Sequence, residues 1–347
     1  MSPYALSIIM SSLATGTMLT LSSNHWFLAW MGLELNTLAI IPLMTKTHHP
    51  RATEAATKYF LMQALASAMI LFSSTMNAWF MGEWEITNMS HPISTTILTI
   101  GLAMKLGIAP FHLWLPDVLQ GLSLLTCLIL STWQKIAPMI LMIQIHLQLN
   151  TNLLIIMAIM STTIGGWGGL NQTHIRKIMA YSSIAHLGWM MLVLCFMPTL
   201  TILNLIIYMI MTTVMFVMFI NMMSTTINKM AMSWLKNPMM AASMMIILMS
   251  LGGLPPTTGF MPKWLIIQEM TKQNMIAITT IITLSSLLSL FFYLRMSYSI
   301  SLTTAPNTSN TCSIWRQKNQ NSTLLSMMII FSTLMLPITP TLINILK

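Results

Sequence analysis

Long apolar runs separated by short polar stretches dominate the hydrophobic pattern of this chain. A helix that spans a bilayer needs about 20 mostly apolar residues, and scanning on this basis predicts about eleven such helices. They are expected at residues 4–22, 26–44, 55–80, 93–118, 122–142, 153–170, 178–196, 200–223, 239–270, 276–298 and 325–346. The third, fourth and ninth are longer than a bilayer requires, so each must tilt, extend beyond the lipid or break. The pattern therefore predicts an all-α membrane protein.

Composition agrees with this fold class. Of the 347 residues, 55% are hydrophobic and only 6% are charged, whereas soluble domains carry about 25% charged residues. We therefore interpret residues 1–347 as a single polytopic membrane domain. The net charge of +9 does not indicate a nucleic-acid partner, because the basic residues are scattered singly between apolar runs and are better explained by membrane topology.

The charged residues outside the apolar runs are sorted by side. With an odd number of spans, the ends on the N-terminal side carry Lys46, Arg51, Lys58, Arg176, Lys177, Lys229, Lys236, Arg295, Arg316 and Lys318. The opposite ends carry Lys272 and Lys347 together with Glu83, Glu85 and Glu269. The positive-inside rule then places the N-terminus on the cytoplasm-like side. The basic clusters at 46–51 and 176–177 are interpreted as topology signals or as contacts with anionic lipids such as cardiolipin.

Four ionisable residues lie inside the predicted spans, namely Glu34, Lys105, Lys135 and Lys263. A charge at mid-membrane costs about 2.5–3.5 kcal/mol on insertion scales, so four of them need an explanation. Structural ion pairs between helices are one, and snorkelling of a lysine near a helix end is another. The interpretation that we favour is a proton relay, because burial lowers the pKa of a lysine and a neighbouring carboxylate raises it.

Helix-breaking residues stand beside two of these lysines. Residues 106–110 read Leu-Gly-Ile-Ala-Pro after Lys105, and residues 251–255 read Leu-Gly-Gly-Leu-Pro before Lys263. Proline removes a backbone donor and glycine tolerates unwound geometry. Paired interrupted helices are typical of transporters built from inverted repeats, although two simple proline kinks are the alternative. We predict two discontinuous helices, repeats at 25–142 and 153–298, and a separate C-terminal helix at 325–346.

Four further features of the sequence add to this picture. His186 precedes Lys263 by 77 residues (186 to 263) and Glu34 precedes Lys105 by 71 (34 to 105), which suggests corresponding pairs in the two repeats. His112 follows the first break, and both histidines are possible relay groups or hydrogen-bonded structural residues. Asp117 and Gln120 are expected to cap this broken helix at its end on the N-terminal side of the membrane. The glycines at 165–169 are expected to end a helix and to allow close packing.

No redox cofactor or metal is expected in this chain. Cys127, Cys195 and Cys312 are far apart, and the sequence lacks a C-x-x-C pair, a P-loop and a G-x-G-x-x-G fingerprint. An iron–sulfur cluster, structural zinc or bound nucleotide is therefore not predicted.

Several of these stretches together resemble the antiporter-like membrane subunits of mitochondrial NADH–ubiquinone oxidoreductase, the respiratory complex I. The resemblance covers nearly the whole chain and is carried by residues 50–55, 58–61, 103–107, 109–112, 132–135, 166–173, 176–186, 252–256 and 260–264. The abundance of Met and Thr also resembles chains encoded in animal mitochondrial DNA. One departure is Asp117, where many vertebrate relatives have glutamate.

The resemblance implies a proton-pumping subunit of the inner membrane with eleven helices and its N-terminus on the matrix side. It implies that Glu34, Lys105 and Lys263 form a polar axis bridged by Lys135. NAD, FMN, Fe–S clusters and ubiquinone would be bound elsewhere in the complex, and other membrane subunits would be its partners. Two alternatives stay open: a stand-alone cation/proton antiporter, and a passive scaffold subunit whose buried charges are only structural.

Overall fold

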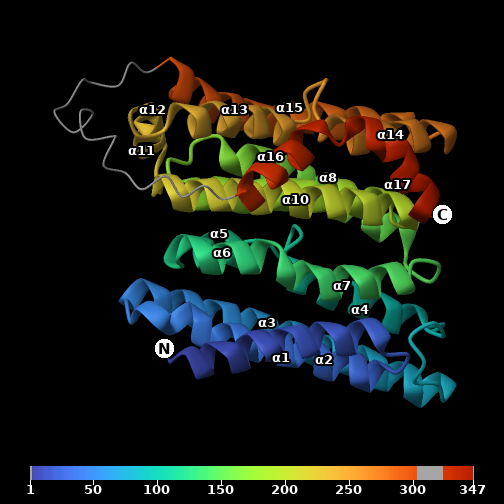
Figure 1. Cartoon of the computed structure of the whole chain (residues 1–347). Coiled ribbons are helices and arrows are strands. Elements are labelled where there is room, and N and C mark those ends of the chain that lie inside the picture. Colours follow the sequence, from blue (N-terminus) through green and yellow to red (C-terminus); the bar gives the residue numbers. More distant parts are fainter. Residues whose placement is uncertain (1, 303–322, 347) are drawn as a thin grey trace. The chain divides into compact units, whose positions relative to one another are not determined.

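The computed structural model describes residues 2–302 and 323–346, and this part of the chain is helical and contains no β-strand (Figure 1). The α-helices are α1 (Pro3–Ser22), α2 (Trp26–Met44), α3 (Pro50–Met81), α4 (Pro92–Leu106), α5 (Trp114–Gly121), α6 (Leu124–Ser131), α7 (Trp133–Gln144), α8 (Thr151–Gly169), α9 (Ile175–Val193), α10 (Pro198–Met222), α11 (Ile227–Ala231), α12 (Ser233–Lys236), α13 (Pro238–Gly252), α14 (Phe260–Lys272), α15 (Ile276–Ser301), α16 (Thr323–Leu334) and α17 (Thr339–Leu346). Two short 3₁₀ turns, η1 (Thr45–Thr47) and η3 (Leu336–Ile338), interrupt them.

Each of the eleven predicted spans corresponds to a helix or to a pair of consecutive helices. Seven segments of the described chain are long and apolar enough to cross a membrane, and the bent pair of α16 with the segment Leu336–Asn344 makes an eighth. The three predicted spans outside this set are α9, the pair α4 and α5, and the pair α13 and α14. The all-α membrane fold is thus confirmed.

Several helices begin with a proline that follows a polar capping residue. The pattern occurs at Ser2-Pro3, His49-Pro50, His91-Pro92 and Asn237-Pro238, where the first side chain accepts a hydrogen bond from a backbone N–H of the first turn. Proline suits the first helical position because no intrahelical bond is lost there. For this reason α3 begins at Pro50 and not at residue 55, where the apolar run starts.

The chain forms two compact units. The first comprises Met1–Ser161 with Leu194–Pro198, and the second comprises Thr162–Val193 with Thr199–Lys347. In the first unit α2 packs between α1 and α3, and α3 also packs against α4 and α5 (Figure 1). The α1–α2 contact is close because Gly32 lacks a side chain, and a Cβ there would lie 2.7 Å from Thr20 Cγ2.

In the second unit α13 packs against α15 and α16, while α9 packs against α14 and α15. The C-terminal turns of α8 belong to this unit and approach α9 closely, since a Cβ on Gly165 would lie 2.8 Å from the backbone nitrogen of Ala185. The helix then ends at Gly169. The predicted role of this glycine-rich stretch is therefore confirmed.

Charged residues lie at opposite ends within each unit. In the first, Arg51 and Lys58 lie near the start of α3, and Glu83 follows its end. A helix of 32 residues rises about 1.5 Å per residue, so its two ends are about 48 Å apart. In the second, Arg295 Nη1 donates to Leu170 O at 2.6 Å, close to the start of α9, whereas Glu269 and Lys272 lie at the end of α14. The sorting follows the predicted pattern for these residues, and Arg316, Lys318 and Lys347 lie outside the described residues.

Candidate functional site

The first predicted break is a true helix end. Gly107 terminates α4 in the left-handed region at φ 75°. Its N–H donates to Met104 O at 3.2 Å, and the next N–H, of Ile108, donates to Ala103 O at 3.0 Å. This pair of bonds is a Schellman motif, which satisfies the last carbonyls of a helix and favours glycine. The chain resumes as α5 only at Trp114, so the first discontinuous helix is confirmed.

The second break has the same backbone geometry. Gly253 follows α13 at φ 81°, its N–H donates to Ser250 O at 3.0 Å, and Leu254 N donates to Met249 O at 3.3 Å. The structural match is thus between Gly107 and Gly253. The two Leu-Gly-x-x-Pro stretches at 106–110 and 251–255 are therefore offset by one residue from this structural match.

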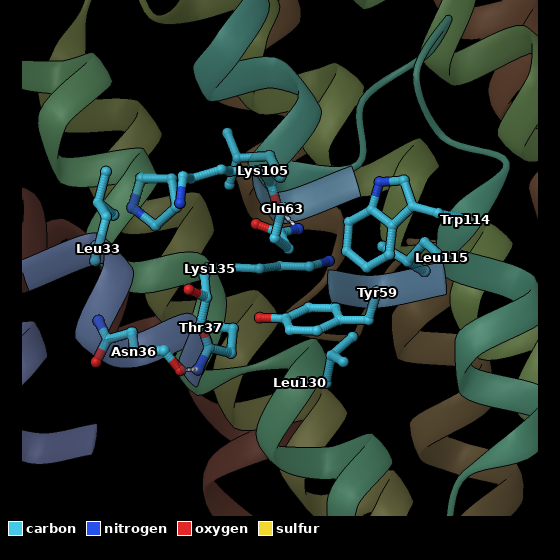
Figure 2. Close-up of a pocket in the computed structure, with 14 residues that line it drawn as sticks. Leu33, Asn36, Thr37, Tyr59, Gln63, Lys105, Trp114, Leu115, Leu130 and Lys135 are labelled. Atoms are coloured by element: carbon cyan, nitrogen blue, oxygen red, sulfur yellow. Dashed lines mark hydrogen bonds between the residues drawn. The ribbon is translucent and has the colours of Figure 1, made fainter. Parts of the chain in front are cut away.

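A small polar cavity lies beside the first break. Its volume is about 20 Å³, measured as the space open to the centre of a water molecule, which is room for about one water. Lys105 of α4 and Lys135 of α7 both line it, and their exposed fractions are 6% and 3%. The remaining wall is formed by Leu33, Asn36, Thr37, Tyr59, Gln63, Leu106, Trp114, Leu115, Leu130, Gln134, Ala137 and Pro138. Figure 2 shows Lys135 extending into the space bounded by Tyr59, Gln63 and Trp114.

Amide side chains tie the helices around this cavity together. Gln63 Nε2 on α3 donates to Lys105 O at 3.4 Å, so it reaches the carbonyl of a residue in the last turn of α4. Gln134 Nε2 on α7 donates to Asn36 O at 3.1 Å on α2. Each bond links one wall of the cavity to the next, and the bond from Gln63 also satisfies a carbonyl in the last turn of α4, which has no intrahelical donor.

Glu34 lies on α2 next to the cavity wall and is half-buried. Its carboxylate is close enough to Lys105 for electrostatic interaction. Within the described part of the chain, however, neither Glu34 Oε2 nor Lys105 Nζ has a hydrogen-bonding partner. Buried charged groups without partners are costly, so both side chains gain from a shared water or from a movement toward each other.

The span that carries Lys135 is itself irregular. α6 ends at Ser131 and α7 begins at Trp133, with Thr132 between them at φ −113° and ψ −73°. Pro138 then lies inside α7, where it cannot donate to the carbonyl of Gln134. Sequence reasoning did not identify this irregularity, although Pro138 was a signal for it.

The second unit has a smaller counterpart of the cavity. Lys263 lies in the first turns of α14, after the break, and its Nζ donates to Gly252 O at 2.8 Å. A cation at this carbonyl end of α13 is favoured by the helix dipole. A cavity of about 10 Å³ beside it is lined by His186, Trp189, Asn204, Ile207, Tyr208, Met211, Gly259, Pro262 and Lys263. The rings of His186 and Tyr208 are 5.4 Å apart.

The predicted site residues thus fall into separate groups. Glu34, Lys105 and Lys135 gather around the first break, while His186 and Lys263 gather around the second. His112 is buried, with Nδ1 3.2 Å from Pro110 O, and lines neither of the two cavities.

The helix caps expected at Asp117 and Gln120 have an outcome. Asp117 lies in the first turn of α5 and pairs with Lys58 at 3.5 Å. The C-cap of α5 is Leu122, and Gln120 lies inside the last turn; the expected caps are therefore wrong. Among the described residues there is no group of three or more His, Cys, Asp or Glu side chains that could hold a metal.

Sequence reasoning missed the neutral residues of both cavities. Tyr59, Gln63 and Trp114 surround the lysines of the first unit, and Tyr208 faces His186 in the second. Such residues occur throughout the apolar spans, so no local signal separates them from core filling. The one signal that could have identified them is a position one helical turn from a residue that faces a buried charge.

Each of the two breaks thus has a lysine beside it, Lys105 at the first and Lys263 at the second, and the comparisons with known proteins place the chain in the antiporter-like class of membrane proteins. The family model described as "NADH:quinone oxidoreductase/Mrp antiporter, TM" matches residues 23–289, and that described as "NADH dehydrogenase subunit 2 C-terminus" matches residues 290–343. NADH-ubiquinone oxidoreductase chain 2 of Xenopus laevis is 58% identical over 341 residues, covering 98% of this chain and 99% of that protein. The Squalus acanthias protein of the same name is 57% identical and covers 98% of each chain.

Solved structures agree at the level of the fold. A chain of respiratory complex I from Thermus thermophilus matches with a TM-score of 0.83 and 23% identity, covering 97% of this chain and 80% of that one. A chain of the Mrp complex from Dietzia sp. matches with a TM-score of 0.76 and 19% identity, covering 87% and 62%. The chain belongs to the NADH–ubiquinone oxidoreductase chain 2 family, within the antiporter-like class, as its sequence motifs predicted.

Proposed function

We propose that this chain is a proton-translocating membrane subunit of NADH:ubiquinone oxidoreductase in the mitochondrial inner membrane. Its family membership and the names of its animal relatives support this assignment. The oxidation of NADH, with FMN and iron–sulfur clusters, and the reduction of ubiquinone take place in other parts of the complex. Other membrane subunits are its partners, and its basic helix ends contact anionic lipids such as cardiolipin.

The observation that carries the proposal is the polar cavity beside the first break. It gathers two buried lysines, and the half-buried Glu34 lies beside it. At an effective dielectric constant near 20, two unit charges about 4 Å apart interact by about 4 kcal/mol. A change in the charge or position of Glu34 is therefore large enough to decide whether Lys105 keeps its proton.

The relay works in steps within the first unit. When Glu34 is ionised and close, it favours the charged form of Lys105. When Glu34 swings away or takes up a proton, Lys105 loses its counter-charge and releases its proton into the cavity. Lys135 lines the same cavity and is the next acceptor. Lys263 then serves as a later acceptor, and the free energy for the cycle comes from the redox reaction elsewhere in the complex.

A passive scaffold subunit is one alternative. It predicts that neutralising Glu34 or Lys105 lowers the amount of assembled complex and leaves turnover per complex normal. A stand-alone cation/proton antiporter is the other alternative, and native gel electrophoresis separates it from a complex I subunit because a free antiporter migrates far below the whole complex.

The test uses Glu34→Gln and Lys105→Met at the matching positions of a bacterial relative, where the gene can be edited. We expect both variants to assemble and to slow coupled quinone reduction, because each removes a titrating group and preserves side-chain size. Lys58→Met, at an exposed ion pair outside the cavity, is the matched control. Parental pumping in both cavity variants would refute the relay assignment for this pair.

Sidedness is tested separately. The proposal places the loop before α9, with Arg176 and Lys177, in the matrix, and the loop with Glu83 and Glu85 in the intermembrane space. Labelling in intact mitoplasts should modify the Glu83 loop and leave the Arg176 loop unmodified. Labelling of the Glu83 loop only after the inner membrane is ruptured would reverse the topology.

A further inference from the structure

Three helix faces of the second unit converge on the cavity beside Lys263. Asn204 and Tyr208 are four residues apart on α10, so they lie on one face of that helix, and both line the cavity. His186 contributes the face of α9, and Lys263 contributes the first turns of α14. This cavity therefore brings together an imidazole, a phenol, an amide and an amine.

The phenol group of Tyr208 is buried beside Ser183. Its side chain is 2% exposed, and its hydroxyl lies within electrostatic reach of the Ser183 hydroxyl. The Ser183 hydroxyl donates its own proton to Ala180 O at 2.7 Å. The phenol of Tyr208 has one proton to donate and lone pairs that can accept another.

The volume of the cavity limits what else can carry a proton here. About 10 Å³ is at the lower limit for one water molecule, so a chain of several waters does not fit. A proton that moves between His186 and Lys263 needs another group with an exchangeable proton. Of the neutral residues that line this cavity, Tyr208 alone carries a hydroxyl.

We propose that the Tyr208 hydroxyl is a proton-relay group between His186 and Lys263. This inference rests on the proposed function, since it assumes that Lys263 takes up and releases protons. In the step, protonated His186 gives a proton, directly or through one water, to the phenol oxygen of Tyr208. The original hydroxyl proton passes to the neutral amine of Lys263. Tyr208 ends unchanged, His186 becomes neutral and Lys263 becomes charged.

The test is Tyr208→Phe in complex assembled from a recoded copy of this chain. The change removes one oxygen and keeps the ring that contacts His186. We expect the rate of proton translocation per assembled complex to fall about tenfold, below the 10²–10⁴ typical of a lost acid–base group, because a water can partly replace the hydroxyl. The solvent deuterium isotope effect on quinone reduction should rise, which a purely structural role would not cause.

Tyr293→Phe is the matched control. Tyr293 is also buried in the second unit, at 1% exposure, but does not line this cavity; its variant should keep the parental rate. Tyr208→His should recover part of the rate that Tyr208→Phe loses, because imidazole also exchanges a proton. If Tyr208→Phe lowers only the amount of complex and the isotope effect is unchanged, the hydroxyl is structural and the relay inference is wrong.

Lys263→Met in the same background separates this inference from the proposed function. If Lys263→Met stops translocation and Tyr208→Phe retains the parental rate, then only the Tyr208 relay is refuted. If Lys263→Met also retains the parental rate, the second unit does not carry protons and the proposed function of Lys263 is wrong.

Discussion

The two helix breaks share a backbone but hold their lysines differently. Both end a helix in a Schellman motif at a glycine with positive φ, Gly107 in one unit and Gly253 in the other. Lys105 precedes its break by two residues, and its Nζ has no hydrogen-bonding partner among the described residues. Lys263 follows its break and donates to Gly252 O. The same backbone device therefore accommodates two different chemical environments.

This difference concerns the charges beside each lysine. Lys105 lies within electrostatic reach of the Glu34 carboxylate, whereas Lys263 is bound to a carbonyl at a helix end, which is a permanent dipole. On the proposed function, we infer that the first site is the switching site, since its counter-charge can change, and that the second site receives protons in a fixed environment.

Exchanging lysine for arginine should have the largest effect and tests whether both lysines titrate. Arginine keeps the positive charge but does not release a proton in a protein. We expect Lys105→Arg and Lys263→Arg each to slow proton translocation by about a hundredfold or more, the lower end for a lost acid–base group. Proton uptake in proteoliposomes, normalised to assembled complex, measures this.

The outcome at Lys263 sharpens the comparison. If Lys263→Arg translocates protons normally while Lys105→Arg does not, Lys263 is a structural cation bound to the end of α13, and only the first break carries protons. Normal translocation by both variants would show that neither lysine needs to release a proton.

Alanine at the two glycines should have an intermediate effect that again differs between the breaks. Left-handed backbone costs an L-residue about 1–2 kcal/mol, so both Gly107→Ala and Gly253→Ala should lower the melting temperature of the complex. A Cβ on Gly253 would lie 2.9 Å from Lys263 Nζ, whereas a Cβ on Gly107 would lie 2.8 Å from Leu115 Cδ1. We therefore expect Gly253→Ala to reduce turnover per complex as well, and Gly107→Ala to reduce it much less. Equal losses of turnover in the two variants would show that turnover depends on the geometry of the helix breaks and not on the position of the Lys263 amine.

The parts of this fold that could be predicted from the sequence are those with strong free-energy signals. Apolar runs of span length are costly in water, whereas charges inside them, and the unpaired backbone that Gly and Pro create beside Lys105 and Lys263, are costly in lipid, so few arrangements satisfy all of these constraints. The discontinuous helices and the membrane fold followed directly from those costs.

Weaker signals were misjudged. The sequence did not show which of the adjoining Gly252 and Gly253 matches Gly107, because only the backbone shows which one has positive φ. The start of α3 was missed because the cap at His49 and Pro50 extends a helix into polar sequence. Asp117 reaches Lys58, which is distant in the sequence. Gln63 and Tyr208 could not be found because their roles depend on which helix faces meet.

The smallest expected effect concerns the polar side chains that fix each break. Gln63 Nε2 donates to Lys105 O, and the hydroxyl of Thr258, inside the second break, donates to Ser332 O. A neutral hydrogen bond contributes about 1 kcal/mol, so Gln63→Leu and Thr258→Val should each destabilise the complex slightly in thermal melts. Gln63 also lines the cavity with both lysines, so Gln63→Leu should in addition slow translocation by up to about fivefold, the factor equivalent to about 1 kcal/mol. Thr258→Val alters a residue outside the second cavity and should leave the translocation rate per complex unchanged. If Thr258→Val slows translocation as much as Gln63→Leu does, the geometry of each break limits the rate, and the polar lining of the first cavity does not.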